Sequence, residues 1–355
     1  MEFALTEVRK FLEQQPVTAS APCRIDIGGT LDIPTLSFPL RRLCPRTVNV
    51  ALNLRTSIHL SAGGLRRVRV DSTGFAPAEF SPSEAPYDHP LGLIFAAADH
   101  FGLAGVDIRI NSASPVRSAL GGSSVALVAL VGALARVAHR LGGRKRSLSE
   151  VAMLAQGLEA AVAGVPCGFQ DQLAAAFGGV NAWHWRADDA AGVFRREPLL
   201  SAEDAAGLGP HLAVAYMGVP HASKDINGQW VSRFLAGRDR KRWVEIVEIV
   251  RRFSTCLTRK AYGEAARLMN RETEIRLAMT PEVLDSLGRR LAADAVDLGC
   301  GARFAGAGGG GCIWAIGESA PVEALRRRWH KLLAERDGAR LLDVGVDSSG
   351  LLCQL

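Results

Sequence analysis

The alternation of hydrophobic and polar residues divides the chain into a first half rich in strands and a second half rich in helices. Period-two alternation, typical of strands, occurs at residues 24–27, 47–52, 57–60 and 107–110. The first 18 residues have instead the spacing of a short amphipathic helix, which stops near Pro16. The early part of the chain is therefore predicted to form a sheet preceded by one helix.

Helical periodicity dominates from the middle of the chain onwards. A small-residue loop at 119–124 leads into a predicted apolar helix that ends near Leu141, and a capping box of Ser147 and Glu150 starts the next helix. Later helices are predicted at 240–256, at 262–279, after Pro281 and from Pro321, with strands at 179–197, 312–316 and 341–346. The longest apolar run, from Val125 to Ala135, is shorter than the roughly 20 residues that a bilayer span needs.

These elements predict an α+β fold with two domains, 1–198 and 199–355. A chain of 355 residues with 48% hydrophobic residues is long enough for two cores. The first ten residues mix charges of both signs and lack the pattern of a signal peptide, so we expect a cytoplasmic protein.

Charge and cysteine content narrow the function classes. The 42 Lys and Arg exceed the 36 Asp and Glu by six, but the densest basic groups (144–146, 238–242 and 326–328) contain few aromatic residues. This favours solvated surfaces over a nucleic-acid groove, and a positive field suits an anionic substrate such as a nucleotide or sugar phosphate. The seven cysteines form no close pairs, which predicts reduced thiols.

A glycine- and serine-rich segment, residues 115–126, precedes the long apolar helix. Glycines leave backbone N–H groups exposed, and a helix N-terminus adds partial positive charge, so this segment is a candidate phosphate loop. Ser123 and Ser124 can donate to phosphate oxygens or ligate Mg²⁺. An ordinary loop with a helix cap remains the alternative.

A second glycine run, residues 306–311, matches the letters of a dinucleotide fingerprint. Because a strand rather than a helix follows it, a nicotinamide enzyme is disfavoured. Four successive glycines favour contact with a ligand over a plain turn.

Two further segments carry isolated carboxylates. Residues 164–172 place Asp171 where a helix should start, and residues 21–32 place Asp26 and Asp32 around a double-glycine turn. Taken alone, each of these acids is explained by a helix cap or a turn. Glu159 lies at the edge of an apolar stripe, where glutamate normally faces solvent.

Together and in this order, these segments resemble the three signature regions of the GHMP kinases. Residues 21–32 are similar to the first region, 119–124 to the second and 306–312 to the third. The run 164–172 resembles galactokinases, and its extension to residue 181 is closer to heptose-7-phosphate kinases. Residues 47–51 also resemble that branch and the fucokinases. The resemblance implies an N-terminal domain like domain 2 of ribosomal protein S5, and a ferredoxin-like C-terminal domain.

The resemblance also implies roles for individual residues. Asp171 would accept the proton of the attacking hydroxyl and Arg24 would lie beside it, while Glu159 with Ser123 or Ser124 would hold Mg²⁺. The implied nucleotide-binding residues are Pro115, Leu120, Gly121, Gly122, Ser123 and Ser124. The implied substrate-binding residues are Asp26, Gly29, Thr30, Asp32, Gln170, Asp171, Gly308, Gly309 and Gly310.

The chain departs from the family pattern at several positions. Cys23 replaces a glycine, Ala119 replaces the first glycine of the second region, and Arg303 begins a replacement for the common Lys-x-Thr. The Glu-His pair that precedes the sugar-binding aspartate of galactokinases is missing before Asp32, which argues against galactose itself. The chain has no Walker A sequence, so the ordinary P-loop route to ATP is excluded.

These features predict a kinase that uses ATP and Mg²⁺ and phosphorylates a sugar hydroxyl. The expected acceptor is the anomeric hydroxyl of a heptose 7-phosphate or a hexose. A kinase for a non-sugar alcohol (mevalonate or homoserine type), a catalytically silent sugar or nucleotide sensor and a basic nucleic-acid-binding module are the alternatives. We expect a monomer or homodimer, with neither nucleic acid nor a membrane as partner.

Overall fold

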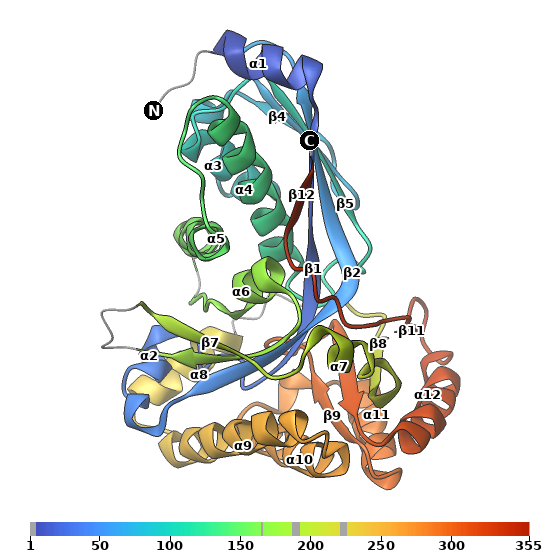
Figure 1. Cartoon of the computed structure of the whole chain (residues 1–355). Helices are drawn as coiled ribbons and strands as arrows, with labels where there is room; N and C mark the ends of the chain where they lie inside the picture. The colour runs from blue at the N-terminus through green and yellow to red at the C-terminus, as the bar shows by residue number, and fades with distance from the viewer. Residues whose placement is uncertain (1–4, 165, 187–191, 221–225, 355) are drawn as a thin grey trace.

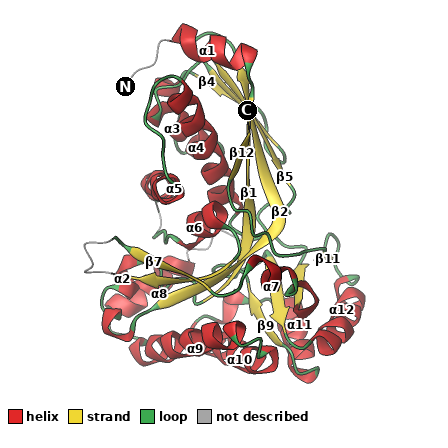
Figure 2. Ribbon diagram, viewed as in Figure 1, coloured by secondary structure: helices red, strands yellow, loops and turns green. Residues whose placement is uncertain are grey.

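The structure, a computed structural model, contains two sheets with helices packed against them (Figures 1 and 2). It describes residues 5–164, 166–186, 192–220 and 226–354. An eight-stranded sheet lies in the upper half of Figure 1 and extends into the lower half, and a four-stranded sheet lies below it. The α+β fold with two domains is thereby confirmed.

The first sheet is built on two long antiparallel strands. These are β1 (Val17–Ile27) and β2 (Arg46–Ala62), which pair along most of their length. The sheet is completed by β3 (Val68–Ser72), β4 (Ala78–Phe80), β5 (Val106–Ser112), β6 (Val180–Trp185), β7 (Phe194–Pro198) and β12 (Leu352–Gln354). Only the β3–β5 pair is parallel among the described strand pairs of this sheet.

Helices cover one face of this sheet (Figures 1 and 2). They are α3 (Gly92–His100), α4 (Gly122–Arg140), α5 (Leu148–Ala163) and α6 (Gln170–Phe177), and α1 (Leu5–Gln14) lies at the upper end. Within the described ranges, α4 is the one helix long and apolar enough to cross a membrane by length and composition alone. Its window is 67% buried, and it packs between β1 and α5 as a core helix.

The second sheet consists of β8 (Leu212–Tyr216), β9 (Gly301–Phe304), β10 (Cys312–Ile316) and β11 (Arg340–Leu342), all antiparallel. The larger helices that accompany it are α9 (Arg240–Thr258), α10 (Tyr262–Met279), α11 (Ser286–Asp297) and α12 (Ser319–Leu333). The shorter α2 (Pro34–Ser37), α7 (Ala202–Ala206) and α8 (Ile226–Leu235) complete the described α-helices. Helix α10 packs directly on β9, and this contact brings Glu272 of α10 next to Arg303 of β9.

Most predicted elements are present, and the structure adds several that the sequence did not predict, among them α3, β8 and β9. The two strands predicted at 47–52 and 57–60 are one strand, β2, and the predicted strand at 341–346 is reduced to β11. The last strand, β12, returns to the first sheet and pairs with β1, so the chain after Val346 packs on the first half. The boundary at residue 198 therefore stays a prediction.

Two smaller predictions are confirmed. The Ser147 side chain accepts a hydrogen bond from the Glu150 amide at the start of α5, and the Glu150 carboxylate accepts one from the Ser147 amide. All seven cysteines are free thiols, and four of them are buried.

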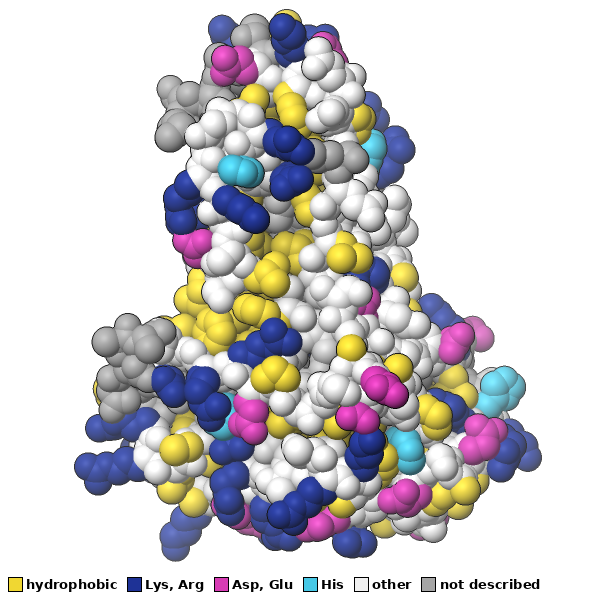
Figure 3. All heavy atoms as spheres, in the orientation of Figure 1, with side chains coloured by type: hydrophobic (Ala, Val, Ile, Leu, Met, Phe, Trp, Pro, Cys, Tyr) yellow, Lys and Arg dark blue, Asp and Glu magenta, His cyan; other side chains and the backbone are white. Residues whose placement is uncertain are grey.

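The basic clusters of the sequence are largely balanced by acids. Arg144 pairs with Glu150, Arg242 with Asp239, and Arg328 with Asp294. On the face shown in Figure 3, Lys and Arg side chains are scattered among Asp and Glu over the lower half. This arrangement is typical of solvated helix surfaces.

Two glycines provide a matched test of the packing between α10 and β9. A Cβ on Gly301 would lie 2.2 Å from the carbonyl oxygen of Ala266 in α10, whereas a Cβ on Gly157 in α5 would meet nothing within 4 Å. We expect Gly301→Ala to lower the free energy of unfolding by about 1–3 kcal/mol through overpacking. Gly157→Ala should raise it by about 0.5–1 kcal/mol because alanine favours the helix. Urea denaturation measures both, and equal effects of the two variants would contradict the packing.

Candidate active site

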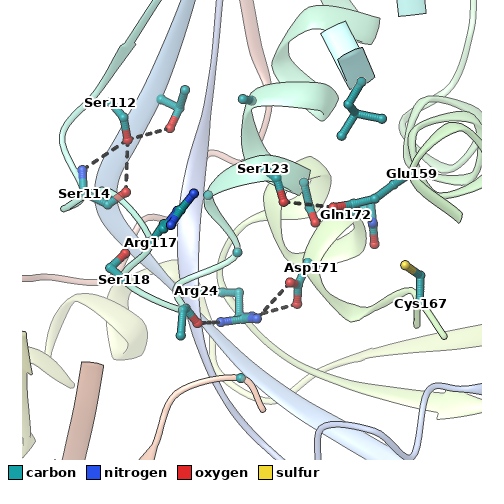
Figure 4. Close-up of a pocket in the computed structure, with 18 of the residues that line it drawn as sticks. Arg24, Ser112, Ser114, Arg117, Ser118, Ser123, Glu159, Cys167, Asp171 and Gln172 are labelled. Carbon is teal, nitrogen blue, oxygen red and sulfur yellow. Dashed lines mark hydrogen bonds and ion pairs between the residues drawn. The ribbon is translucent and has the colours of Figure 1, made fainter. Parts of the chain in front are cut away.

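A cavity of about 510 Å³ brings the signature segments together. Its walls come from the phosphate loop, from the ends of β1 and α6, and from the second half of the chain. Figure 4 shows some of the side chains that line it. The central feature is an ion pair between Arg24 and Asp171, which are 147 positions apart in the sequence.

Arg24 holds Asp171 through two hydrogen bonds. Its Nε donates to Oδ1 and its Nη2 donates to Oδ2, both at 2.8 Å. The Arg24 side chain is only 4% exposed while that of Asp171 is 22% exposed, so the carboxylate faces the cavity and the guanidinium lies behind it. Burial alone would lower the pKa of Arg24, but the charges of Asp171 and Asp26 outweigh it and the pKa is raised.

Strand β1 explains where Arg24 points. The pairing with β2 shifts between Pro22 and Cys23, a bulge that accommodates the proline inside a strand. After the bulge, the Arg24 amide donates to the carbonyl of Leu120 at 3.2 Å, and its Nη1 donates to the carbonyl of Ala119 at 2.7 Å. Arg24 therefore joins β1, the phosphate loop and α6.

Asp171 lies in the first turn of α6, where the helix dipole favours a negative charge. The phosphate loop passes directly beside it, because a Cβ on Gly121 would lie 3.3 Å from its Oδ2. Gly121 has a φ of +81°, which a residue with a side chain would adopt only with strain. The carboxylate of Asp171 is thereby placed against the start of α4.

A second carboxylate, Glu159, lies on the other side of the α4 N-terminus. Its Oε1 accepts a hydrogen bond from the Ser123 hydroxyl at 2.9 Å, and its Oε2 accepts one from the Ser124 hydroxyl at 2.6 Å. Gln172 donates to the same Oε2 at 2.6 Å. Burial and the nearby charge of Asp171 raise the pKa of Glu159 against the effect of these hydrogen bonds. One carboxylate and two hydroxyls form an all-oxygen donor set of the kind that Mg²⁺ prefers.

Asp32 forms the floor of the cavity next to the α6 N-terminus. Its Oδ2 accepts hydrogen bonds from the amides of Phe169 and Gln170, at 2.8 and 3.0 Å. The 166–169 loop passes so close that a Cβ on Gly168 would lie 1.8 Å from this oxygen. Burial, with a contribution from the charge of Asp171, raises the pKa of Asp32 to about 6, although the amide hydrogen bonds oppose the shift.

Thr30 and Asn227 complete this end of the cavity. The Thr30 hydroxyl donates to Oδ1 of Asn227, which lies in α8, at 3.2 Å. Both residues line the cavity. The two halves of the chain thus meet here with polar side chains.

A chain of buried charges lies beneath the ion pair. Asp26 accepts hydrogen bonds from the Arg303 guanidinium at 3.1 Å and from the Gly306 amide at 2.8 Å, and it lies 3.8 Å from Arg24. Arg303 also pairs with Glu272 at 2.9 Å, and Glu272 pairs with Arg276 at 2.7 Å. The side chains of Asp26, Arg303, Glu272 and Arg276 are fully buried.

This network corrects the prediction for Asp26. Its side chain does not line the cavity and its oxygens are occupied by Arg303 and the Gly306 amide, so it supports the site instead of binding substrate. Gly29 lies against it, because a Cβ there would be 2.5 Å from the Asp26 Oδ2.

The predictions for the glycines of the third region also need correction. Gly308 packs under Val283, whose carbonyl would lie 2.7 Å from an added Cβ, and the Gly309 amide donates to the same carbonyl. Gly308, Gly309 and Gly310 are not among the described residues that line the cavity, whereas Gly306 and Ala307 are. The side chain of Leu120 is fully buried in the core and its carbonyl accepts a hydrogen bond from the Arg24 amide, so any contact with the nucleotide would use its backbone amide and stays a prediction.

The remaining predicted residues are brought together by the fold. Those that line the cavity are Arg24, Thr30, Asp32, Pro115, Gly121, Gly122, Ser123, Ser124, Glu159, Gln170 and Asp171. Gln170 also accepts a hydrogen bond from Asn49 at 3.1 Å. Their individual roles stay predictions.

Sequence reasoning missed one end of the cavity and two of its polar side chains, Arg117 and Asn227. Beyond the phosphate loop, the cavity continues between apolar and hydroxyl-bearing side chains of β2, β3, β5 and the start of α3, including Thr56, Ser112, Leu91 and Ile94. Arg117 also points into it (Figure 4). The signal for Arg117 was its place inside the candidate phosphate loop, whereas no local pattern marks Asn227.

Comparisons with known proteins match both halves of the chain. The sequence models for the GHMP kinases N terminal domain and the GHMP kinases C terminal domain match residues 90–179 and 254–335. A comparison with curated protein sequences finds no match.

Solved structures with the same fold include three kinases. Lactococcus lactis galactokinase complexed with galactose has a TM-score of 0.72 at 17% identity, covering 98% of each chain. A D-glycero-D-manno-heptose 1-phosphate kinase from Bacteroides thetaiotaomicron has a TM-score of 0.68 at 17% identity, covering 96% of this chain and 99% of the other. The L. major mevalonate kinase in complex with R-mevalonate has a TM-score of 0.68 at 16% identity, covering 93% and 96%.

The matched domains therefore define a phosphotransferase that acts on hydroxyl groups. The chain belongs to the GHMP kinase superfamily, the ATP-dependent kinases of sugars and related alcohols.

The raised pKa of Asp32 makes stability depend on pH. Because its pKa is about 6 in the folded protein against 3.8 as the ordinary value, the folded state binds the proton more tightly. Stability is therefore highest with Asp32 protonated and is lost as the pH rises from about 4 to 6. Asp32→Asn cannot ionise, so its free energy of unfolding should rise relative to the parent by up to about 3 kcal/mol over this interval. Chemical denaturation at pH 4 and 7 measures the change, and a difference that is constant with pH would contradict it.

Proposed function

We propose that the protein transfers the γ-phosphoryl group of ATP to a hydroxyl group of a sugar. The observation that carries the proposal is the Asp171 carboxylate, which faces the cavity beside the glycine turn at the start of α4 and is fixed by Arg24. Phosphoryl transfer depends chiefly on positioning and charge compensation, and these residues supply both.

Asp171 is proposed to accept the proton of the attacking hydroxyl. Its two hydrogen bonds with Arg24 fix the plane of the carboxylate, and its exposure to the cavity leaves it accessible to a substrate. Arg24 lies close enough to Asp171 that its positive charge also compensates charge that develops on the transferring group.

The turn at Gly121 and Gly122 is proposed to bind the phosphates. These glycines precede α4, a 19-residue helix whose N-terminal amides and dipole favour an anion. Ser123 and Ser124 add hydroxyl donors at the same place. The nucleoside would occupy the apolar and hydroxyl-lined end between β2, β5 and the start of α3, where Leu91 and Ile94 lie.

Glu159 with the hydroxyls of Ser123 and Ser124 would hold Mg²⁺, because the three side chains converge and offer only oxygen ligands. When bound there, Mg²⁺ neutralises charge on the β- and γ-phosphates. Without the ion, the two hydroxyls keep the Glu159 carboxylate aimed at the phosphate loop.

The acceptor is proposed to lie between Asp171, Asp32 and Asn227. This end of the cavity presents carboxylate, amide and hydroxyl groups from both halves of the chain, which suits a substrate with several hydroxyls. This polarity favours a sugar, and we propose the anomeric hydroxyl of a heptose 7-phosphate or a hexose. The heptose kinase and galactokinase with the same fold are consistent with this class.

We further propose that the reaction takes place in the cytoplasm, where ATP is supplied and the seven free thiols stay reduced. A kinase for a non-sugar alcohol is the second candidate, because a mevalonate kinase shares the fold. A silent sensor remains the alternative from another class, since it needs the binding cavity but not the proton acceptor.

Replacing the proposed proton acceptor separates an enzyme from a sensor. Asp171→Asn keeps the size of the side chain and an oxygen for Arg24 but removes the base, so kcat should fall by about 10²–10⁴-fold. The affinity for ADP, measured by calorimetry, should change much less. Asp297→Asn, an exposed acid on α11, is the matched control and should retain full turnover. Parental turnover in Asp171→Asn would rule out the proposed mechanism.

The acceptor class can be identified by a substrate panel. ATP consumption would be followed by a coupled ADP assay with free and phosphorylated hexoses and heptoses, and with mevalonate and homoserine. We expect turnover with a sugar, with a new anomeric phosphate ester in the phosphorus NMR spectrum of the product. Turnover with mevalonate or homoserine alone would leave a kinase but reject the sugar, and phosphorylation at another carbon would reject the anomeric site.

A further inference from the structure

Arg117 has an unusual backbone conformation within the phosphate loop. Its φ is +53°, in the left-handed region that residues with a Cβ seldom adopt. Glycine takes this conformation without strain. Arg66 shares this conformation in an exposed turn, so the positive φ alone assigns no function; its importance at Arg117 is that it sets the direction of the side chain.

Two hydrogen bonds fix the backbone directly after Arg117. The carbonyl of Ser118 accepts a hydrogen bond from the Cys312 amide at 2.8 Å, and the carbonyl of Ala119 accepts one from Arg24 at 2.7 Å. The loop is therefore clamped by β10 on one side and by β1 on the other. These contacts hold the strained conformation and so determine the direction of the Arg117 side chain.

The Arg117 guanidinium is available to a ligand. It lines the cavity and is exposed to it, and within the described ranges of the chain it has no hydrogen-bond acceptor or carboxylate partner. Figure 4 shows it pointing into the space between Ser114 and Ser123. Arg24 is the other described basic residue that lines the cavity, and its guanidinium is already engaged by Asp171 and Ala119.

We propose that Arg117 binds the nucleotide through the phosphates nearer the nucleoside, the α- and β-phosphates. This rests on the proposed function, in which Ser123, Glu159 and Asp171 surround the transferring phosphoryl group. Arg117 lies on the opposite side of that group, toward the hydroxyl-lined end at Ser112 and Ser114. A planar guanidinium matches two phosphate oxygens at once and forms short, charge-assisted hydrogen bonds with them.

The test compares ADP and adenosine binding by calorimetry in the parent and in Arg117→Gly. The variant should bind ADP about ten- to a hundredfold more weakly, because charge-assisted hydrogen bonds are lost. Its affinity for adenosine, which has no phosphate, should stay within about twofold of the parent. Thermal stability should be unchanged or higher, since glycine adopts a positive φ freely. Arg117→Lys keeps the positive charge but not the planar guanidinium, so its ADP affinity should lie between those of the parent and Arg117→Gly.

Arg66 provides the matched control. It is an exposed arginine with a φ of +60°, in the turn between β2 and β3 and outside the cavity. Arg66→Gly should relieve the same kind of strain and leave ADP affinity unchanged.

The outcomes separate this proposal from the function on which it rests. Parental ADP affinity in Arg117→Gly, or an equal loss of ADP and adenosine affinity, would show that Arg117 is structural and overturn the proposal alone. A parent protein that binds ADP tightly and turns over a sugar leaves the proposed function standing in either case. If the parent protein binds no ADP, both the proposed role of Arg117 and the proposed kinase function are rejected.

Discussion

The site depends on the burial of Arg24. A guanidinium that is almost completely shielded from water is costly unless carboxylates surround it, and here Asp171 and Asp26 do so. Asp26 in turn is paired with Arg303, which is paired with Glu272, which is paired with Arg276. Three cations and three carboxylates thus compensate one another in a continuous chain of contacts.

This chain of charges explains why the two halves of the molecule must be packed together for the site to exist. Arg24 and Asp26 come from β1, whereas Arg303 comes from β9 and Glu272 from α10. Removing one member would leave a buried charge without a partner, which costs far more than the pair contributes. The orientation of the proposed base therefore rests on residues that never reach the cavity.

The glycine run at 306–311 shows the limit of reading a motif as a ligand site. The sequence suggested ligand contact, but much of the glycine requirement comes from other chain segments. A Cβ on Gly311 would lie 2.5 Å from the carbonyl of Ser118, and Gly306, at a φ of +60°, lies against the carbonyl of Ala119. The third region therefore packs against the backbone of the phosphate loop at Ser118 and Ala119. Of residues 306–311, Gly306 and Ala307 line the cavity.

Local chemistry explains what the sequence could predict. The capping box at Ser147, the apolar helix from Gly122 and the signature segments depend on residues a few positions apart, so the elements and most cavity residues were predictable. Asp26 and Arg303 are 277 positions apart, and only the folded chain reveals that they neutralise each other. The place of Asn227 in the cavity was missed for the same reason, because only folding brings it into contact with Thr30 from the other half of the chain.

The same burial that makes Asp32 costly to ionise would make it effective in binding the proposed acceptor. At neutral pH its carboxylate is charged in a poorly solvated place, with one oxygen satisfied by the two amides at the start of α6. A hydroxyl donated to such a carboxylate replaces missing hydration and so gains more than it would at the surface. Ionised Asp32 would thus lower the free energy of unfolding but raise the affinity for the acceptor, a combination that is common at functional sites. If Asp32 binds the acceptor as proposed, acceptor binding and full ionisation of Asp32 would favour each other, next to the base that would receive the proton.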